Sequence, residues 1–212
     1  MRVRAFTVGP FQENTFLVRP DDSDRAVLID PGDEPDLLLG GIEQEGVTVE
    51  AILITHTDID HVGAVAPVAK ATGARVYCPK LEVERLADIM AFAPMPDLGP
   101  YEGYQADETV EGGERLNLAG MDIEVVFTPG HTEGHVTYAF PQGAVIASGD
   151  VLFQGSVGRS DRPNGDHQTL LRSIATLLER YPDETTVLPG HMGATTLGHE
   201  RATNPFLAEL AR

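Results

Sequence analysis

The sequence predicts an α/β fold built in layers around one core, and three observations support this prediction. Short runs of β-branched and aromatic residues recur along the chain and end at Pro, Asp, Gly or His. Segments with helix start and stop signals separate several of these runs. The chain has 212 residues, of which 42% are hydrophobic. This length suits one large core, so we expect a single domain over residues 1–212.

The first part of the chain is expected to consist mainly of strands. Three runs that end at turn residues come first, and they are RVRAFTV, NTFLVRP and AVLIDPG. The segment PDLLLGGIEQEG then favours a short helix. EAILITH is a continuous apolar run, which is typical of a strand buried on both faces. His56 stands at the carboxyl end of this strand.

A βαβ-like passage follows His56 in the chain. HVGAVAPVAKATG is predicted to be a helix that is interrupted near Pro67 and stopped by Gly73, and ARVYCPK is predicted to be a strand. A second helix is expected from Leu81 to Met90. Residues 91–112 are crowded with Pro and Gly and are expected to form a long loop. Four large side chains of this loop are expected either to cover the active site, to form a dimer contact or to attach the loop to the core: Phe92, Met95, Tyr101 and Tyr104.

The last part of the chain alternates strands with one long helix. Three strands are predicted, MDIEVVFTPGH, HVTYAFP and GAVIASGD, and their ends carry His131, His135 and Asp150. A glycine-rich segment leads to the helix HQTLLRSIATLLERY, which Asp166 is placed to cap at its N-terminus. TTVLPGH is the last strand and ends at His191. A short helical tail, LGHERATNPFLAELAR, follows.

Four polar residues share one position relative to the strands. His56, His131, Asp150 and His191 each follow directly on an apolar strand. Strand ends that converge on one edge of a sheet place such side chains in a common cleft, where binding sites of layered α/β folds lie. We therefore expect these four side chains to meet.

Composition excludes several classes of function. The formal net charge is -18, from 33 acidic and 15 basic residues, so the average surface repels phosphate backbones and nucleic acid is not an expected partner. No signal-peptide pattern occurs, and no stretch approaches the roughly 18 apolar residues that span a bilayer. The protein is expected to be soluble and cytoplasmic. The single cysteine, Cys78, excludes an intramolecular disulfide and is expected to pack as a small apolar residue at a strand end.

The segment THTDIDH at residues 55–61 offers four potential metal ligands within six residues. They are His56, Asp58, Asp60 and His61. Imidazole and carboxylate groups suit zinc, iron or manganese, and ligands at alternate positions let one turn present several of them to the same point. Two imidazoles and two carboxylates after a buried strand would otherwise be costly, because buried charge requires a partner.

Four motifs together resemble a known family. THTDIDHVG, TPGHTEGH, SGDVLF and LPGH, in this order and spacing, resemble the ligand motifs of the metallo-β-lactamase superfamily, whose signature is HxHxDH followed by separate His, Asp and His ligands. The resemblance extends from GPFQENTFLV near the N-terminus to NPF near the C-terminus. It implies a four-layer αββα sandwich with a dinuclear metal site along one edge.

The resemblance also implies a ligand set for two divalent metal ions. His56, Asp58 and His131 would hold the first metal, Asp60, His61 and His191 the second, and Asp150 would bridge them. Residue 58 departs from the family, because most members have His where this chain has Asp. Zinc is the first expectation, and iron or manganese are alternatives, above all at the site that contains Asp58, because a carboxylate is a harder ligand than imidazole. The other alternative is that Asp58 turns outward and the first metal is weakly bound or lost.

Within the family, GPFQENTFLV, GDVLFQGSVGRSD and TTLGHERATNPF resemble glyoxalase II-like thioesterases in their short bacterial form. The resemblance implies hydrolysis of a small acyl thioester by a metal-bridging hydroxide that Asp60 and Asp150 orient. No GxSxG serine elbow is present. Arg159 matches the family's basic residue that contacts the carboxylate of the thiol carrier. Only 21 residues, 192–212, follow His191 where full-length glyoxalase II enzymes carry a helical domain, so glutathione recognition must be reduced or replaced. A homodimer is left open.

Other functions remain as alternatives. Persulfide dioxygenases share this fold and a segment comparable to GRSD at 158–161, and they use one iron, which His56, His131 and Asp150 would hold here. A flavodiiron reductase would need a flavin domain, and a β-lactamase, a nuclease or a metal-binding module without catalysis fits the motifs less well. Three further histidines are outside the ligand set: His135 is a candidate to support the ligands from behind, and His167 and His199 are expected at the surface.

Overall fold

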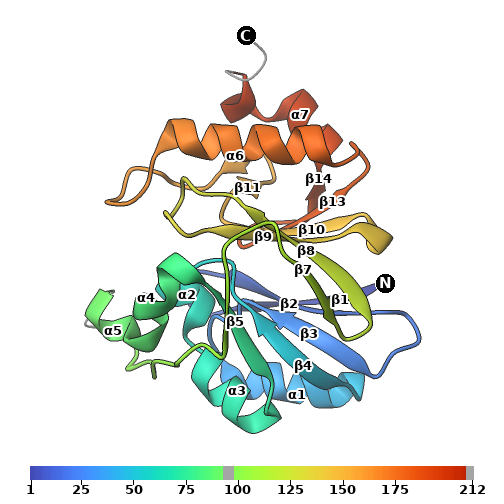
Figure 1. Ribbon diagram of the computed structural model, residues 1–212, viewed down its shortest axis with the longest axis vertical. Coiled ribbons are helices and arrows are strands. Elements are labelled where there is room, and N and C mark those ends of the chain that lie inside the picture. Colours follow the sequence, from blue (N-terminus) through green and yellow to red (C-terminus); the bar gives the residue numbers. More distant parts are fainter. Residues whose placement is uncertain (93–97, 209–212) are drawn as a thin grey trace.

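Two six-stranded sheets face each other, and helices cover their outer faces in the computed structural model shown in Figure 1. Residues 1–92 and 98–208 are described. Helices α1 (Pro35–Glu45) and α3 (Val65–Thr72) cover the first sheet, and α6 (His167–Arg180) and α7 (Leu197–Thr203) cover the second. The layers run helix, sheet, sheet, helix, so the predicted αββα sandwich is confirmed.

The first sheet has the strands in chain order, β1-β2-β3-β4-β5-β6. Its strands are β1 (Arg2–Val8), β2 (Glu13–Arg19), β3 (Arg25–Ile29), β4 (Thr48–Leu53), β5 (Arg75–Pro79) and β6 (Glu108–Val110). The first three pair antiparallel, whereas β3 to β6 pair parallel. The metal motif begins in the turn that follows β4. Because parallel strands end at the same edge of a sheet, this turn lies at the edge where β3 and β5 also end.

The second sheet has the order β14-β13-β10-β9-β8-β7. Its strands are β7 (Arg115–Leu118), β8 (Met121–Phe127), β9 (Val136–Phe140), β10 (Val145–Gly149), β13 (Thr186–Pro189) and β14 (Thr195–Thr196). Only β10 and β13 pair parallel, and Gly149 lies opposite Pro189. The residues that follow these two strands therefore leave the sheet side by side. A small hairpin of β11 (Leu152–Phe153) and β12 (Ser156–Val157) lies in the glycine-rich segment.

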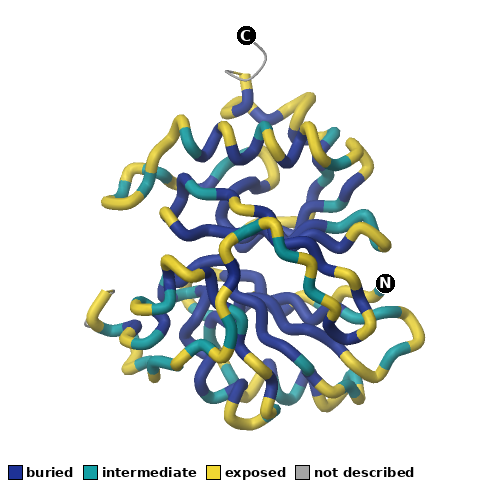
Figure 2. Tube along the Cα trace, viewed as in Figure 1, coloured by how far each residue is buried: buried dark blue, intermediate teal, exposed yellow. Residues whose placement is uncertain are grey.

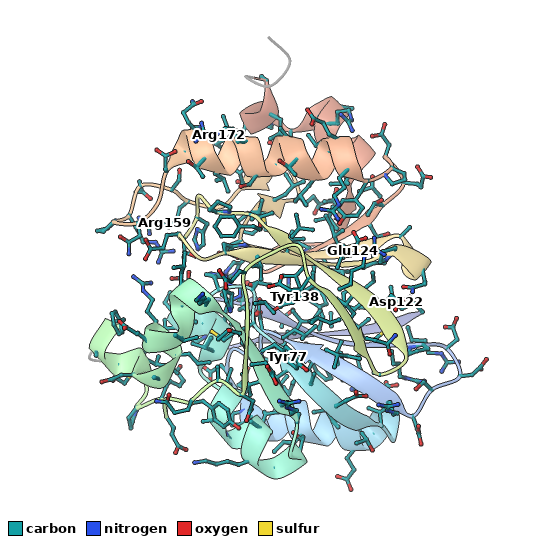
Figure 3. The ribbon with its side chains drawn as sticks, viewed as in Figure 1. Tyr77, Asp122, Glu124, Tyr138, Arg159 and Arg172 are labelled. Atoms are coloured by element: carbon teal, nitrogen blue, oxygen red, sulfur yellow. The ribbon has the colours of Figure 1, made fainter. Side chains whose placement is uncertain are left out.

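Three apolar clusters fill the spaces between the layers. One lies between the first sheet and its helices, a second between the two sheets, and a third under α6. The buried strands and the alternating burial along the helices are visible in Figure 2. Tyr138 lies between the two sheets (Figure 3), where its hydroxyl donates to the Ile54 carbonyl oxygen at 3.0 Å. This hydrogen bond ties the second sheet to the first one residue before the metal motif begins.

The helix expected after His61 is interrupted, but not near Pro67. A short helix, α2 (Ile59–Val62), ends before Gly63, and α3 begins at Val65. Pro67 lies in the first turn of α3, where a backbone N–H has no intrahelical partner in any case. The predicted position of the break was therefore wrong, and the predicted stop at Gly73 is confirmed by its left-handed backbone, φ 71°.

The segment from Lys80 to Val110 is less continuous than predicted. A 3₁₀ turn, η1 (Lys80–Glu82), leads into α4 (Val83–Ala87), and α5 (Ile89–Phe92) follows after Asp88, so one helix over 81–90 is corrected to three short pieces. In the expected loop, Tyr101 and Tyr104 pack against the first core. They therefore attach the loop to the core, which was one of the three expected roles. Met95 lies outside the described residues. The strands β6, β7, β11, β12 and β14 were not predicted, and because β14 pairs with β13, the expectation that TTVLPGH is the last strand was wrong.

The C-terminal half follows the sequence closely. Asp166 caps α6, since its side chain accepts a hydrogen bond from the Thr169 backbone N–H at 2.7 Å. The tail forms α7 and the 3₁₀ turn η3 (Pro205–Leu207), so the predicted helical tail is confirmed up to there. Across the part of the chain that the structure describes, every helix is too short or too polar to cross a membrane.

Candidate metal centre

The structure brings the seven predicted ligand residues to one edge of the sandwich, around a cavity of about 740 Å³. His56 and Asp58 come from the turn between β4 and α2, Asp60 and His61 come from α2 itself, and one residue each follows β8, β10 and β13. They are His56, Asp58, Asp60, His61, His131, Asp150 and His191. The first sheet thus supplies four of these side chains and the second sheet three, so the cavity lies where the two sheets meet.

One cluster joins His56, Asp58 and His131, each of which offers one ligand atom within 4.8 Å of the others. Asp58 Oδ2 lies 3.6 Å from His56 Nε2 and 3.0 Å from His131 Nε2. Asp58 therefore faces inward, which contradicts the alternative that it turns away from the site. These three residue types form a mixed imidazole and carboxylate set that suits a transition metal ion.

A second cluster joins Asp60, His61 and His191 within the same distance limit of 4.8 Å. Asp60 Oδ2 lies 3.3 Å from His191 Nε2. Asp150 lies between the two clusters: its Oδ1 is 3.3 Å from His61 Nε2, and its Oδ2 is 3.6 Å from the Nε2 atoms of both His131 and His191. One carboxylate therefore reaches toward ligand atoms of both clusters.

Hydrogen bonds on the outer side of two histidines decide which ring nitrogen faces the centre. Asp30 Oδ2 lies 3.0 Å from His61 Nδ1, and the same oxygen accepts from the Thr55 hydroxyl at 2.6 Å. Since that hydroxyl donates to Asp30, it accepts from His56 Nδ1 at 3.0 Å. Both histidines thus hold a proton on Nδ1 and turn Nε2 toward the cavity, the arrangement typical of metal-binding histidines.

His131 is oriented in the same way from the second sheet. Its Nδ1 donates to the Arg159 backbone carbonyl at 2.7 Å, so its Nε2 faces the centre. His135, which follows four residues later, is buried; its Nε2 accepts from the Asp150 backbone N–H at 3.1 Å and its Nδ1 meets the Thr128 hydroxyl at 3.0 Å. His135 therefore positions Asp150, in agreement with a supporting role, and His167 and His199 are exposed as expected.

Three buried ligand atoms at the centre have no hydrogen-bond partner within the described residues. They are His56 Nε2, His61 Nε2 and Asp150 Oδ1. The last two lie 3.3 Å apart but lack hydrogen-bond geometry. Leaving such groups unpaired costs about 1–3 kcal/mol each, and their convergence on one point is what a metal site requires. These residues therefore fit the divalent metal ions that the motifs imply.

The electrostatics of the centre pair lowered carboxyl pKa values with raised histidine pKa values. Burial raises the pKa of Asp58, but hydrogen bonds from His131 and His56 outweigh burial and hold the pKa well below its ordinary value. Burial likewise opposes protonation of His61, yet Asp150 and then Asp30 raise its pKa well above 6.5. The four carboxylates around the centre thus favour positive charge at this position.

Small residues let the ligand segments approach one another. A Cβ atom at Gly190, which precedes His191, would lie 2.3 Å from Asp150 Oδ1 and 2.6 Å from the His61 ring. Gly149 has φ 47°, and a Cβ there would lie 2.4 Å from the Thr55 hydroxyl oxygen. Both glycines are required by contact between the ends of strands from the two sheets.

Arginines line the same cavity. Arg159 is exposed and pairs with Asp161, through Nε to Oδ1 at 2.8 Å and Nη2 to Oδ2 at 3.0 Å, and it extends from the edge of the two sheets in Figure 3. Arg162, which the sequence analysis did not select, donates to Asp58 and lies 3.0 Å from His131 Nε2. The signal was available in principle, because Arg162 follows the GRSD segment directly.

Glu82 is a further site residue that sequence reasoning missed. It is buried in η1 and accepts hydrogen bonds from the Thr57 and Thr132 hydroxyls, each at 2.5 Å, and from the Gly134 N–H at 3.2 Å. Thr57 belongs to the metal motif after β4, and Thr132 follows His131. Glu82 therefore links the two segments that carry the first cluster. Nothing in its local sequence distinguishes it from a surface glutamate.

Two further buried residues hold the second cluster. Asn14 Nδ2 donates to the backbone carbonyls of Pro189 at 3.1 Å and Met192 at 2.8 Å, on both sides of His191. Glu13 is fully buried 3.8 Å from His61 Nδ1, and burial raises its pKa well above the ordinary value. Both belong to the segment GPFQENTFLV, which carried the resemblance but was given no role in the site.

Comparison with known proteins agrees with this geometry. Residues 8–191 match the model of the Metallo-beta-lactamase superfamily. The chain is 38% identical to the probable metallo-hydrolase YqgX of Bacillus subtilis and 35% identical to the hydroxyacylglutathione hydrolase GloC of Haemophilus influenzae. Each alignment covers 98% of this chain and 98% of the relative.

Solved structures give the same result. The B3 metallo-beta-lactamase BLEG-1 superposes with a TM-score of 0.91 at 36% identity, over 98% of this chain and 100% of that chain. TTHA1623, solved in a di-iron-bound form, has a TM-score of 0.87 at 44% identity, over 97% and 100%. ETHE1 from Myxococcus xanthus has a TM-score of 0.80 at 26% identity, over 99% and 85%. With its ligand motifs gathered at one edge of an αββα sandwich, this chain belongs to the metallo-beta-lactamase superfamily.

Proposed function

We propose that this protein is a metal-dependent hydrolase of small acyl thioesters that binds two divalent metal ions. The observation that carries the proposal is the pair of ligand clusters joined by Asp150 at the floor of one cavity. Metal dependence follows from the family. The thioester substrate is our inference from this chain's own motifs and from its likeness to a hydroxyacylglutathione hydrolase.

The proposed ligands follow the two clusters. His56, Asp58 and His131 would hold the first metal, and Asp60, His61 and His191 the second. Asp150 would contact both, because its two oxygens face ligand atoms of both clusters. When bound, the metal ions would supply Lewis acidity toward the substrate carbonyl and would activate water near neutral pH.

The chain's own residues supply orientation. Asp60 and Asp150 are the carboxylates at the cavity floor that can accept a hydrogen bond from the attacking water and so aim it at the carbonyl carbon. A thiolate leaves without a strong general acid, because the pKa of a free thiol is about 8.5. The described cavity lining holds no serine or cysteine nucleophile paired with a base, in keeping with direct attack by water.

The size of the cavity supports a substrate larger than a simple acyl group. A volume of about 740 Å³ falls in the range of pockets that hold drug-sized ligands. Arg159 lines this cavity, and we propose that it contacts the carboxylate of the thiol carrier after release from Asp161. A surface pair of this kind contributes about 0–1 kcal/mol, so its release costs little.

Metal identity is a separate part of the proposal. Zinc is the first expectation for a site rich in imidazole, and the Asp58 carboxylate favours iron or manganese at the first position. The di-iron form of TTHA1623 is a precedent in a protein 44% identical to this chain. A mononuclear iron enzyme resembling ETHE1 is the alternative. The second cluster of Asp60, His61 and His191 is complete, however, and gives no reason to prefer one metal ion over two.

The test is metal content measured together with turnover. We expect about two metal ions per chain in protein purified without chelator, and hydrolysis of S-D-lactoylglutathione or of simpler acyl thioesters. Asp60→Ala should abolish turnover and remove one metal. Asp183→Ala, at an exposed aspartate outside the cavity lining, should change neither. One iron per chain, no thioester hydrolysis and oxygen uptake with glutathione persulfide would instead establish the dioxygenase.

A further inference from the structure

The cavity wall differs in chemistry on its two sides. Beside the second cluster it is apolar: Phe153 packs edge-on against His191 at 5.8 Å between ring centroids, Met192 follows His191 in the chain, and Phe11 shares a small adjoining hollow with Asp60. Beside the first cluster the lining carries arginines. The metal centre lies between these two sides.

Two apolar side chains on this side of the cavity are exposed to solvent. Phe11 is 44% exposed and Met192 is 58% exposed, and both line the cavity. Single exposed apolar residues are common, but a group of them beside a concave site indicates a surface that a ligand covers.

The backbone at Met192 adds a second, independent observation. Met192 has φ 69°, in the left-handed region that favours glycine, and Asn14 Nδ2 holds its carbonyl oxygen at 2.8 Å. A methionine kept in this conformation with its side chain in solvent gains nothing for the fold, and strain of this kind gathers at functional sites.

The cationic side carries three arginines on a chain whose net charge is -18. Arg162 contacts Asp58 and Arg159 pairs with Asp161. Arg85 stacks over the Phe92 ring at 5.6 Å and forms no ion pair with residues 1–92 or 98–208. Arg162 and Arg159 are thus neutralised by carboxylates, and Arg85 is the arginine of the described lining whose charge is left for a ligand. An unpaired cation in a concave site attracts an anionic group.

We infer that the substrate has an apolar arm, which lies on Phe11 and Met192, and an anionic arm, which lies toward Arg85. This inference rests on the proposed function, because the scissile C–S bond of a thioester joins two arms that extend to opposite sides of the centre. Hydrolysis adds water to the carbonyl carbon and breaks the C–S bond, which gives a carboxylic acid and a thiol. Either arm can be the acyl group: an apolar acyl group on an anionic thiol, or an anionic acyl group on an apolar thiol.

Binding of thioethers tests the two arms without turnover. S-hexylglutathione and S-methylglutathione carry the same anionic arm, lack a scissile carbonyl and differ only in the apolar arm. By calorimetry on the metal-loaded protein we expect the hexyl compound to bind at least about tenfold more tightly, because each buried methylene contributes. Equal affinities would overturn the inference.

Variants of the cavity wall test where the apolar arm binds. Phe11→Ala and Met192→Gly should each remove most of the hexyl preference, whereas Phe206→Ala, which is 46% exposed and outside the cavity lining, should leave it intact. Met192→Gly suits the positive φ, so its thermal unfolding temperature should not fall, which separates loss of binding from loss of fold. Equal effects of Phe11→Ala and Phe206→Ala would overturn the assignment.

A charge variant assigns the anionic arm. Arg85→Gln should weaken binding of S-hexylglutathione severalfold but leave the uncharged hexyl thioether of N-acetylcysteamine unaffected. Arg75→Gln, at an exposed arginine paired with Glu108 outside the cavity lining, is the control and should change neither affinity. An identical loss for both thioethers in Arg85→Gln would show that Arg85 does not act through charge.

Turnover then shows whether the apolar arm is the acyl group or the thiol. Faster hydrolysis of S-hexanoylglutathione than of S-D-lactoylglutathione would place the apolar group on the acyl side. Faster hydrolysis of the S-hexyl thioester of succinic acid than of S-hexanoylglutathione would place the apolar group on the thiol side. Strong hexyl preference in binding with no hydrolysis of any thioester would reject the proposed function and still support the two-armed cavity.

Discussion

Asp58 makes the first ligand cluster more negative by one charge unit than a neutral histidine at this position would. Asp58 faces inward, 3.0 Å from His131 Nε2, and interactions with His131 and His56 outweigh burial and keep its pKa far below the ordinary 3.8. It is therefore a carboxylate at any physiological pH. A carboxylate is a harder ligand than imidazole, so this position bears on which metal ion the first cluster selects.

Replacing this carboxylate should change metal selectivity. In Asp58→His we expect a higher ratio of zinc to iron than in the natural chain, because the first cluster then offers three imidazoles. The ratio is measured by elemental analysis of protein expressed in medium with equal zinc, iron and manganese. Asp183→His, at an exposed position, is the control. An unchanged ratio in Asp58→His would mean that Asp58 does not bind the metal.

Glu82 is the residue on which the geometry of the first cluster depends. Glu82→Ala leaves two buried hydroxyls and one N–H without their acceptor, so we expect the free energy of unfolding to fall by about 1–3 kcal/mol for each of these groups that stays unpaired. It should also lower metal occupancy at the first cluster. Both are measured, by urea unfolding and by elemental analysis.

Two matched variants sharpen this prediction. Glu82→Gln keeps the shape and can still bond both threonines, so it should retain most of the metal. Glu84→Ala, at an exposed glutamate two residues later, should change neither property. If Glu82→Ala bound two metals normally, the link between the ligand segments would be unnecessary for the centre.

At the scale of the elements, parallel pairing places the ligands. The strands β10 and β13 pair parallel with Gly149 opposite Pro189, and the Gly190 N–H donates to the Gly149 carbonyl at 2.9 Å. Asp150 and His191 therefore emerge together. Antiparallel pairing would have placed them at opposite ends of the sheet.

The cap of α6 allows a prediction about this element alone. Asp166 accepts from both the backbone N–H and the hydroxyl of Thr169, at 2.7 and 2.6 Å. In Asp166→Ala we expect a loss of about 1 kcal/mol in the free energy of unfolding, with metal content unchanged. Urea unfolding checks the first part and elemental analysis the second. Asp161→Ala, an exposed aspartate that caps no helix, should leave stability nearly unaffected.

At the scale of the whole molecule, the metal centre joins the two halves of the sandwich. Residues after β4 lie on one side and residues after β8, β10 and β13 on the other. Anything that binds only the folded protein stabilises it by an amount that grows with concentration, about 4 kcal/mol at a thousandfold excess over Kd. Metal ions that contact both halves should therefore raise the temperature of unfolding.

This stabilisation should depend on pH. In the metal-free protein, burial opposes protonation of His61 and His191, but Asp150 raises the pKa of His61 and Asp60 that of His191 above 6.5. Raised histidine pKa values stabilise the metal-free fold below 6.5, and this contribution is lost as pH rises through the folded pKa. Over the same range the protons stop competing with metal.

We therefore expect opposite trends with and without metal. From about pH 6 to about pH 8, the unfolding temperature of chelator-treated protein should fall, while the increase caused by added zinc or manganese should grow. Thermal unfolding at each pH, with and without metal, measures both trends. A metal-induced increase that was independent of pH would contradict histidine ligation at this centre.

The sequence predicted much of this protein because its information is local. Apolar strand runs, the cap at Asp166 and the stop at Gly73 are set by neighbouring residues, and the family motifs are short segments at strand ends. The αββα fold followed from those motifs and is confirmed. The ligand set, Arg159 and the single domain stay predictions, although the structure brings the seven ligand side chains together.

The tertiary structure alone decided the surroundings of the centre. Thr57 and Glu82 are 25 residues apart, Asp30 and His61 are 31 apart, and Asp58 and Arg162 are 104 apart. No periodicity or turn preference links residues at such separations, because each contact exists only after both sheets have packed. The sequence by itself therefore determined which residues stand at the strand ends, and packing decided which buried partners orient them and how the cavity wall is divided.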